Sequence, residues 1–66
     1  MKSNIYDIEV QFQHQTEAAV CVRETEDSDD IWLPKIRCEI DPAQPSRGQI
    51  ITLTADENIL SEKGLI

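Results

Sequence analysis

Polar and apolar side chains alternate residue by residue in two stretches of this chain, and this alternation limits the possible folds more than any other feature. The first stretch, residues 5–12, reads IYDIEVQF, and the second, residues 35–41, reads KIRCEID. A period of two residues is typical of a β-strand with one face buried and the other in water. The pattern therefore predicts two half-buried strands. Their expected inward side chains are Tyr6, Ile8, Val10, Phe12, Ile36, Cys38 and Ile40.

Three shorter segments, residues 18–25, 31–34 and 50–55, are rich in β-branched or aromatic residues and predict further strands. Pro34 cannot donate a backbone hydrogen bond, so it should mark an edge strand or a bulge. The polar residues 13–16 are expected to turn the chain between the first two strands. The expected core positions in these segments are Val20, Val22, Ile51 and Leu53.

A short helix is expected after the last strand. Asp56 is a good N-cap, residues 57–63 cover about two turns, and Gly64 suits the left-handed position that ends a helix. The predicted fold class is therefore α+β: a small antiparallel sheet or partial barrel of four to five strands with one short C-terminal helix. Residues 1–66 would form a single domain. The alternative is an all-β barrel in which the helix is only a turn.

The charge of the chain is strongly unbalanced. Thirteen acidic and six basic residues give a net charge of −7 over 66 residues. Such an excess repels nucleic acids and anionic membranes and attracts basic protein surfaces. We therefore expect no direct binding to nucleic acid or membranes, and a basic surface on the partner. Because negative charge also keeps a small domain in solution, its placement matters more than its amount.

The run ETEDSDD, residues 24–30, falls between two expected strands. We interpret it as a hairpin tip that presents carboxylates to a basic partner, with a solvated loop as the alternative. Outward acids on the strands would join it, spaced about 6.6 Å apart at positions i and i+2, and such rows imitate the phosphates of a nucleic acid. These are Asp7, Glu9, Glu17, Glu39 and Asp41. The residues predicted to bind the partner are Glu24, Glu26, Asp27, Asp29, Asp30 and, as an apolar anchor if it faces outward, Trp32.

No combination of residues predicts catalysis, a metal site or a cofactor site. His14, the single histidine, lies in a polar segment without a nearby cysteine or serine to activate. The acidic run lacks the central glycine and the closing glutamate of an EF-hand loop. Gly48 and Gly64 stand alone and do not form a phosphate-binding loop. We therefore expect that the protein is not an enzyme.

The number and spacing of the cysteines indicate in which cellular compartment the protein is expected. Cys21 and Cys38 lie in expected strands without C-x-x-C spacing, and we expect both to be reduced core residues. A disulfide would require neighbouring positions in the sheet. Cys21 and Arg23 should point away from the face that carries the valines. Since the sequence has no apolar run of about eighteen residues and no signal-peptide pattern, we expect a cytoplasmic monomer.

Two short motifs resemble a group of small proteins of bacterial phages and mobile elements. They are WLPK, residues 32–35, and KGLI, residues 63–66, and the resemblance extends over about residues 18–66. Ile36 stands where this group has a serine. With its small size and its acidity, the chain is also similar to the anti-CRISPR proteins that inhibit type I systems.

The resemblance implies an inhibitor in the host cytoplasm that docks onto the DNA path of a Cascade-type surveillance complex and excludes target DNA. We therefore expect a non-enzymatic DNA mimic. The alternative is an accessory module of a phage or plasmid replication or recombination operon, which would recognise a protein through the sheet edge near Pro34 or through the helix. The affinity of a charge-driven mimic should fall with salt, whereas an apolar contact should change little.

Overall fold

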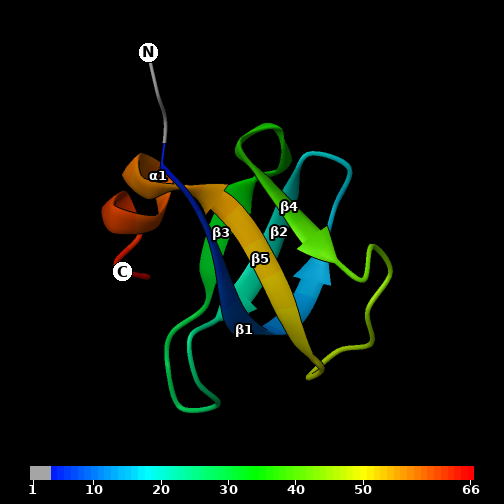
Figure 1. The fold of residues 1–66 in the computed structure, drawn as a ribbon. Helices are drawn as coiled ribbons and strands as arrows, with labels where there is room; N and C mark the ends of the chain where they lie inside the picture. The colour runs from blue at the N-terminus through cyan, green and yellow to red at the C-terminus, as the bar shows by residue number, and fades with distance from the viewer. Residues whose placement is uncertain (1–3) are drawn as a thin grey trace.

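The computed structural model describes residues 4–66, which form one five-stranded antiparallel sheet and a short C-terminal helix (Figure 1). The strand order is β3-β2-β1-β5-β4, so β1 and β5 are central and β3 and β4 are the two edges. Within residues 4–66, no helix is long and apolar enough to cross a membrane. The elements are β1 (Ile5–Gln15), β2 (Ala19–Arg23), β3 (Ile31–Pro34), the 3-10 turn η1 (Lys35–Arg37), β4 (Cys38–Asp41), β5 (Ile50–Asp56) and α1 (Glu57–Glu62).

The sheet is strongly curled because its two edge strands follow each other in the chain. In a flat sheet, four strand spacings would separate β3 from β4 by about 19 Å. The connection between them is η1, and three residues of 3-10 helix rise only about 6 Å. The edges must therefore approach each other, and the open sheet is curled. The predicted α+β class with four to five strands is confirmed.

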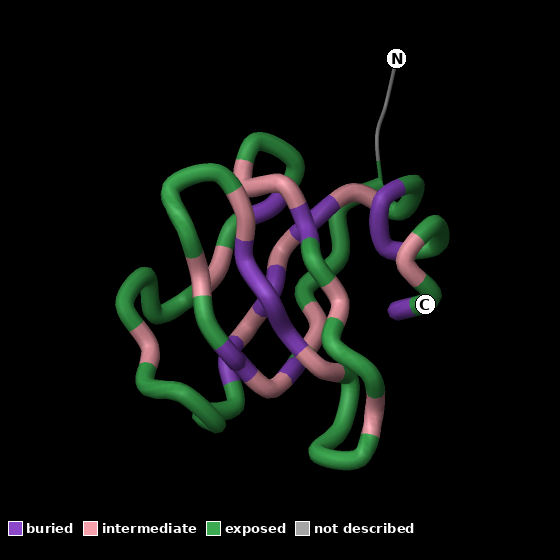
Figure 2. The backbone as a smooth tube through the Cα atoms, turned by 180° about the vertical axis from the view of Figure 1, so that it is seen from behind, coloured by how far each residue is buried: buried purple, intermediate pink, exposed green. Residues whose placement is uncertain are grey.

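The hydrophobic core lies inside the curl, and α1 closes one end of it (Figure 2). The predicted inward positions of β2 and β5 are confirmed, and so are those in the middle of β1. Tyr6 is an exception, because it lies near the start of β1 and is 43% exposed. The buried cluster consists of Val10, Phe12, Val20, Val22, Leu33, Cys38, Ile51, Leu53, Ala55, Ile59, Leu60 and Leu65.

The predicted strand over residues 35–41 is only half correct. Cys38 and Ile40 point into the core as expected, but the strand begins at Cys38 and the preceding three residues form η1. The expectation that Ile36 points inward is wrong, since its side chain is 93% exposed. Alternation between polar and apolar residues could not reveal that the chain must cross here from one sheet edge to the other.

The predicted turn over residues 13–16 is also wrong, because β1 continues to Gln15. Gln13 is buried at an irregularity in the pairing of β1 with β2, and its side-chain amide donates to Gln11 Oε1 at 3.2 Å. The chain turns instead at Thr16, whose hydroxyl accepts two backbone N–H groups at 3.1 and 3.3 Å. A buried polar side chain can thus occupy a strand when it finds a hydrogen-bond partner, which here is Gln11 of the same strand.

Both ends of α1 agree with the sequence prediction. The Asp56 carboxylate accepts the backbone N–H of Ile59 at 2.9 Å, as an N-cap does. Gly64 has a φ of +75° in the left-handed region, and the next residue returns its N–H to Leu60 O at 2.8 Å. These caps hold the apolar side of the short helix against the sheet.

Asp56→Ala is expected to lower the melting temperature by about 5 °C near neutral pH. The N–H of Ile59, with help from Arg37, holds the pKa of Asp56 below its ordinary value of 3.8. The carboxylate therefore stabilises the fold above that pH, and its contribution is lost as the pH falls below it. Thermal unfolding followed by circular dichroism should show a difference between wild type and variant that shrinks from about pH 7 to about pH 2. An equal difference at both values would contradict this role.

Candidate functional site

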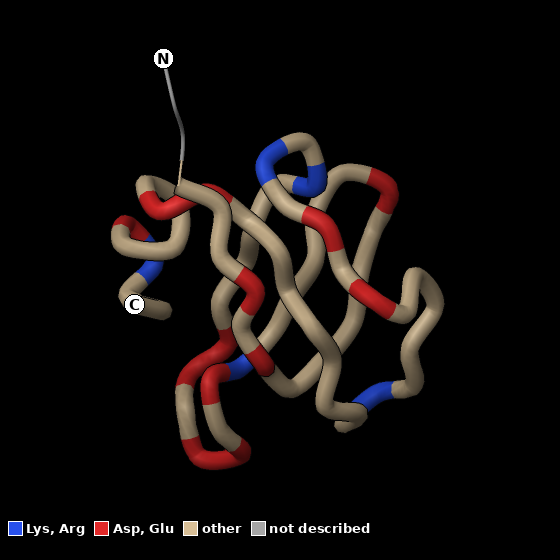
Figure 3. Tube along the Cα trace, in the orientation of Figure 1, with Lys and Arg blue, Asp and Glu red and all other residues tan. Residues whose placement is uncertain are grey.

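Residues 24–30, which we call the acidic loop, connect β2 and β3 and project beyond the end of the sheet (Figure 3). The structure places all five predicted carboxylates of this hairpin tip in exposed positions. They are Glu24, Glu26, Asp27, Asp29 and Asp30. Among residues 4–66, the first four of these form no ion pair. Ion pairs within the described part of the chain therefore leave four of the five carboxylates of the acidic loop without a cation.

Polar contacts at its base give the acidic loop a defined shape. Arg23 Nε donates to Asp30 Oδ1 at 2.5 Å, and Arg23 Nη1 donates to Glu26 O at 3.4 Å. The Thr25 and Ser28 hydroxyls are 2.8 Å apart, and the N–H of Ser28 donates to Thr25 O at 3.1 Å. The hydrogen bond that Arg23 donates to the Asp30 carboxylate raises the pKa of Arg23. Arg23 thus holds the two sides of the loop together while engaging only one of its carboxylates.

A second acidic group, which we call the sheet carboxylates, lies on the outer face of the curled sheet. It consists of Asp7 and Glu9 on β1 and Glu39 and Asp41 on β4. Thr54 pairs with both Asp7 and Glu39, and the other two acids pair in the same way with Thr52. Directly paired residues share a face, so two rows of carboxylates lie about 10 Å apart with a threonine row between them.

The sheet carboxylates are exposed and, within residues 4–66, form no ion pair. Asp7 accepts a hydrogen bond from the Thr54 hydroxyl at 2.6 Å. Register also connects the two acidic groups. The acidic loop leaves β2 at Arg23, which pairs with Gln11, and Glu9 lies two residues from Gln11 on the same face.

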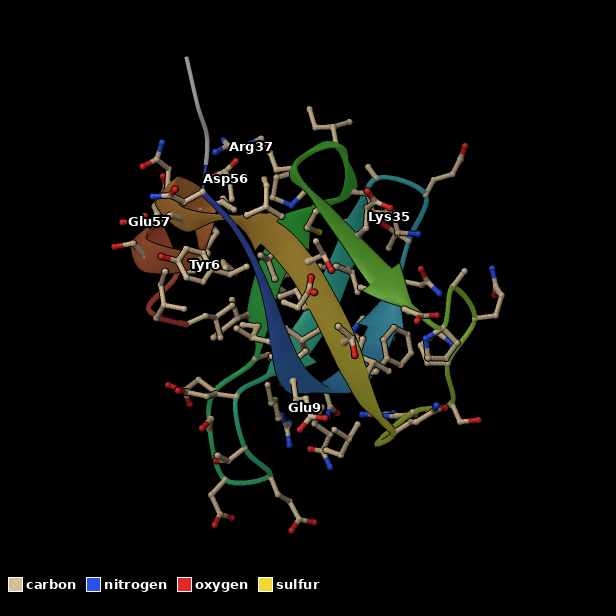
Figure 4. The ribbon with its side chains drawn as sticks, in the orientation of Figure 1. Tyr6, Glu9, Lys35, Arg37, Asp56 and Glu57 are labelled. Atoms are coloured by element: carbon tan, nitrogen blue, oxygen red, sulfur yellow. The ribbon has the colours of Figure 1, made fainter. Side chains whose placement is uncertain are left out.

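Basic residues lie mainly elsewhere. Two of them belong to η1, at the opposite end of the molecule from the acidic loop (Figure 3). One of these, Arg37, points to Asp56 and forms an ion pair at 3.4 Å (Figure 4). Glu17, which the sequence assigns to the outward acids of the strands, lies in the turn between β1 and β2, so that prediction is wrong. The charges are neither evenly mixed nor mutually balanced.

Trp32 lies on the outer face of β3 and is 42% exposed. Its ring contacts His14 edge to face, with the ring centroids 4.8 Å apart. Cys21 pairs with His14 on one side and with Trp32 on the other, so the two rings meet above it. This explains why Cys21 is fully buried although it points away from the valines, as predicted. Burial raises the pKa of its thiol.

Both cysteines are buried and reduced, and they lie on different faces of the sheet. Burial is also the main reason that the pKa of the Cys38 thiol is raised. Among the described residues, no group of three or more His, Cys, Asp or Glu side chains is placed to hold a metal ion. Negative charge is the main chemical feature of the surface formed by the acidic loop and the sheet carboxylates.

Comparisons with known protein families, with curated proteins and with solved structures found no match for this chain. In the structure, the two motifs that carry the resemblance to phage proteins have structural roles. Leu33 is fully buried, and Pro34 accepts a weak hydrogen bond from the Cys38 thiol at 3.5 Å. Gly64 ends α1, and Leu65 is buried in the core. These four motif residues thus support the fold, and the functional assignment depends on the carboxylates and on the partly exposed Trp32.

Proposed function

We infer that this protein is a non-enzymatic inhibitor that competes with DNA for a basic groove on another protein. The observation that carries the inference is the placement of carboxylates in two rows on the sheet, with the acidic loop beside them; among residues 4–66 these rows form no ion pair. A DNA-binding groove is a line of cations that gains affinity by neutralising phosphates and releasing counterions. A folded protein with many carboxylates can bind the same cationic side chains and thereby compete with DNA.

The resemblance to small anti-CRISPR proteins suggests which basic groove this protein would bind. The target would be the path of target DNA through a type I surveillance complex, the Cascade complex, in the cytoplasm of a bacterial host. The partner is then a large assembly whose cations face an open channel. The acidic loop would enter this channel first because it projects beyond the sheet, with Trp32 at its base as an apolar anchor.

Charge reversal in the acidic loop tests this proposal. The double variant Glu26→Lys/Asp27→Lys should lose at least about tenfold in its ability to displace labelled target DNA from a purified type I complex, since each reversal replaces attraction by repulsion. The matched control is Glu17→Lys/Glu62→Lys, which changes the net charge equally at exposed positions away from both acidic groups. Fluorescence anisotropy of the DNA gives the readout.

Three outcomes would contradict the proposal. The wild-type protein could fail to displace DNA from the complex, the control could lose as much as the loop variant, or the displacement could be unchanged between low and moderate salt. Equal losses in both variants would show that only net charge matters. Circular dichroism of both variants confirms that the fold is retained.

A further inference from the structure

Among the strands formed by residues 4–66, β4 is an edge strand, and one of its sides pairs with no other strand. In an antiparallel ladder, alternate residues direct both backbone groups either to the neighbouring strand or away from it. The N–H of Cys38 donates to Lys35 O within η1, so Cys38 does not use it to pair with β5. By alternation, the N–H and C=O groups of Ile40, two residues further on, also point away from β5.

The pairing of β5 with β1 leads to the same direction for the backbone groups of Ile40. The N–H of Glu57 donates to Asn4 O at 2.8 Å, which extends the ladder between β1 and β5. Counting back by two residues twice makes the Ile8 and Leu53 pair a hydrogen-bonded pair. The backbone groups of Leu53 therefore point to β1, and those of its other neighbour, Ile40, have no partner in the sheet.

A hollow of about 360 Å³ lies beside this free edge. Its apolar lining comes from Val20, Cys38, Ile40 and Ala43, and the polar residues that border it are Gln15, Lys35, Glu39 and Gln44. The side chain of Ile40 points to this inner side of the sheet, where it packs against the core. A residue added directly opposite Ile40 would share this orientation and direct its side chain into the hollow.

The charges on β4 favour one kind of partner. Glu39 and Asp41 flank Ile40 on the outer face, both exposed, and within residues 4–66 neither forms an ion pair. If β4 of a second copy paired with β4 around Ile40, each Glu39 would lie opposite an Asp41, and like charges directly opposite destabilise a pair. Basic side chains at the same two positions would be attracted.

We propose that β4 binds an extended segment of a partner protein in which an apolar residue stands between two basic residues. The segment adds antiparallel to β4 as a sixth strand. Its apolar residue exchanges two backbone hydrogen bonds with Ile40 and fills the hollow, while its basic side chains lie opposite Glu39 and Asp41. This recognition goes beyond competition with DNA, because it reads backbone groups and one apolar side chain as well as charge.

The other edge of the sheet is less suited to this role. The N–H of Lys35 donates to Ala18 O at 2.8 Å, so alternation directs the backbone groups of Leu33 to β2 and those of Trp32 and Pro34 outward. Proline has no N–H to donate. Each edge thus has one residue that directs both of its backbone groups outward, Trp32 on β3 and Ile40 on β4. Of these two residues, Ile40 is the one that lines the hollow and stands between two exposed carboxylates.

The test uses a short, end-blocked, fluorescein-labelled peptide with valine at its centre, arginine on each side of the valine and threonine elsewhere. Amide chemical shifts of the full chain should change at Cys38–Asp41 and around the hollow. The same peptide with an N-methylated valine keeps its charge but lacks the N–H that Ile40 accepts, so it should bind at least about tenfold more weakly. A peptide with glutamate in place of arginine should not bind.

Variants of the protein complete the test. Ile40→Pro removes a donor that faces away from β5, so the sheet should form and peptide affinity should fall at least about tenfold. The loop variant Glu26→Lys/Asp27→Lys should bind the peptide as wild type does, which separates this proposal from the proposed function. If Ile40→Pro does not fold, the comparison of the N-methylated and unmodified peptides, both measured with the wild-type protein, still tests the proposal.

Equal binding of the N-methylated and unmodified peptides would overturn the proposal. Shift changes confined to the acidic loop would overturn it too, because they would show that the peptide binds by charge alone. Shifts at β4 that grow with protein concentration in the absence of peptide would identify a second copy as the occupant and would equally contradict it.

Discussion

Replacing Leu53 with alanine is expected to remove a large part of the free energy of unfolding of this protein. Leu53 is fully buried in the central strand β5, where it pairs with Ile8 on one side and Ile40 on the other. Leucine-to-alanine changes in a core cost about 2–5 kcal/mol. For a chain of this length the whole free energy of unfolding is only about 3–10 kcal/mol. One truncation therefore removes much of the total stability.

The matched control is Ile36→Ala, which truncates an aliphatic side chain that is 93% exposed in η1. Its free energy of unfolding should stay within about 0.5 kcal/mol of wild type. Urea unfolding followed by circular dichroism measures both variants. The alternation of polar and apolar residues predicts that Ile36 is a core residue. This pair of variants therefore tests whether the stability of the protein follows that alternation or the burial seen in the structure. A change below about 1 kcal/mol in Leu53→Ala would contradict the assigned core.

Trp32→Ala should make the buried thiol of Cys21 reactive. The rings of Trp32 and His14 meet above Cys21, which has no exposed surface, and burial raises the pKa of its thiol. Removing the indole ring admits solvent and reagent and favours the thiolate, which is the reacting form. We expect alkylation of Cys21 by iodoacetamide to accelerate at least about tenfold.

Mass spectrometry of the alkylated protein reports both cysteines in one experiment. Cys38 lies on the other face of the sheet and serves as the internal control. If the variant merely unfolded more often, both thiols would react faster together. Trp32→Phe keeps an aromatic ring above the thiol and should react much more slowly than Trp32→Ala. Unchanged alkylation of Cys21 in Trp32→Ala would show that other atoms protect it.

The partial burial of the Trp32 side chain affects how it could anchor a partner. The indole is 42% exposed, and its contact with His14 limits the directions from which a partner can approach. Large aromatic side chains near the centre of an interface contribute much of the binding free energy. A partner that contacts Trp32 would therefore protect Cys21 further, and the alkylation assay can detect this protection.

The separation of charge along the molecule also has consequences for association. The acidic loop and the cations of η1 lie at opposite ends, so the molecule has an electric dipole in addition to its net charge of −7 (Figure 3). A basic groove would draw the acidic loop in first and leave η1 facing outward. The nearly fully exposed Ile36 lies at that outward end.

Local signals in the sequence were sufficient for several parts of the fold. The hairpin that carries the acidic loop follows from two apolar segments separated by turn-forming acids. The ends of α1 follow from Asp56 and Gly64, because a cap depends on residues within one turn. The inward side chains of β2 and β5 follow from the strand period. These features are determined by neighbours in the chain.

The candidate site needed more than local signals. The sequence shows that Glu9 and Asp41 point outward, but it does not show that only β5 separates their strands. Likewise, nothing local indicates that His14 and Trp32 cover the same thiol, because they meet only across β2. Irregularities at Gln13 and in η1 depend on how the sheet curls, so periodicity could not predict them.

The amino-acid sequence thus shows which segments are extended, where the helix is capped and that negative charge exceeds positive charge. The order of the strands becomes visible only in the folded protein, and with it the two rows of carboxylates and the free edge of β4. Strand order cannot be inferred locally because it results from burying apolar faces that are distant in the chain. Side-chain alternation records which face is apolar, but not which strand it will meet.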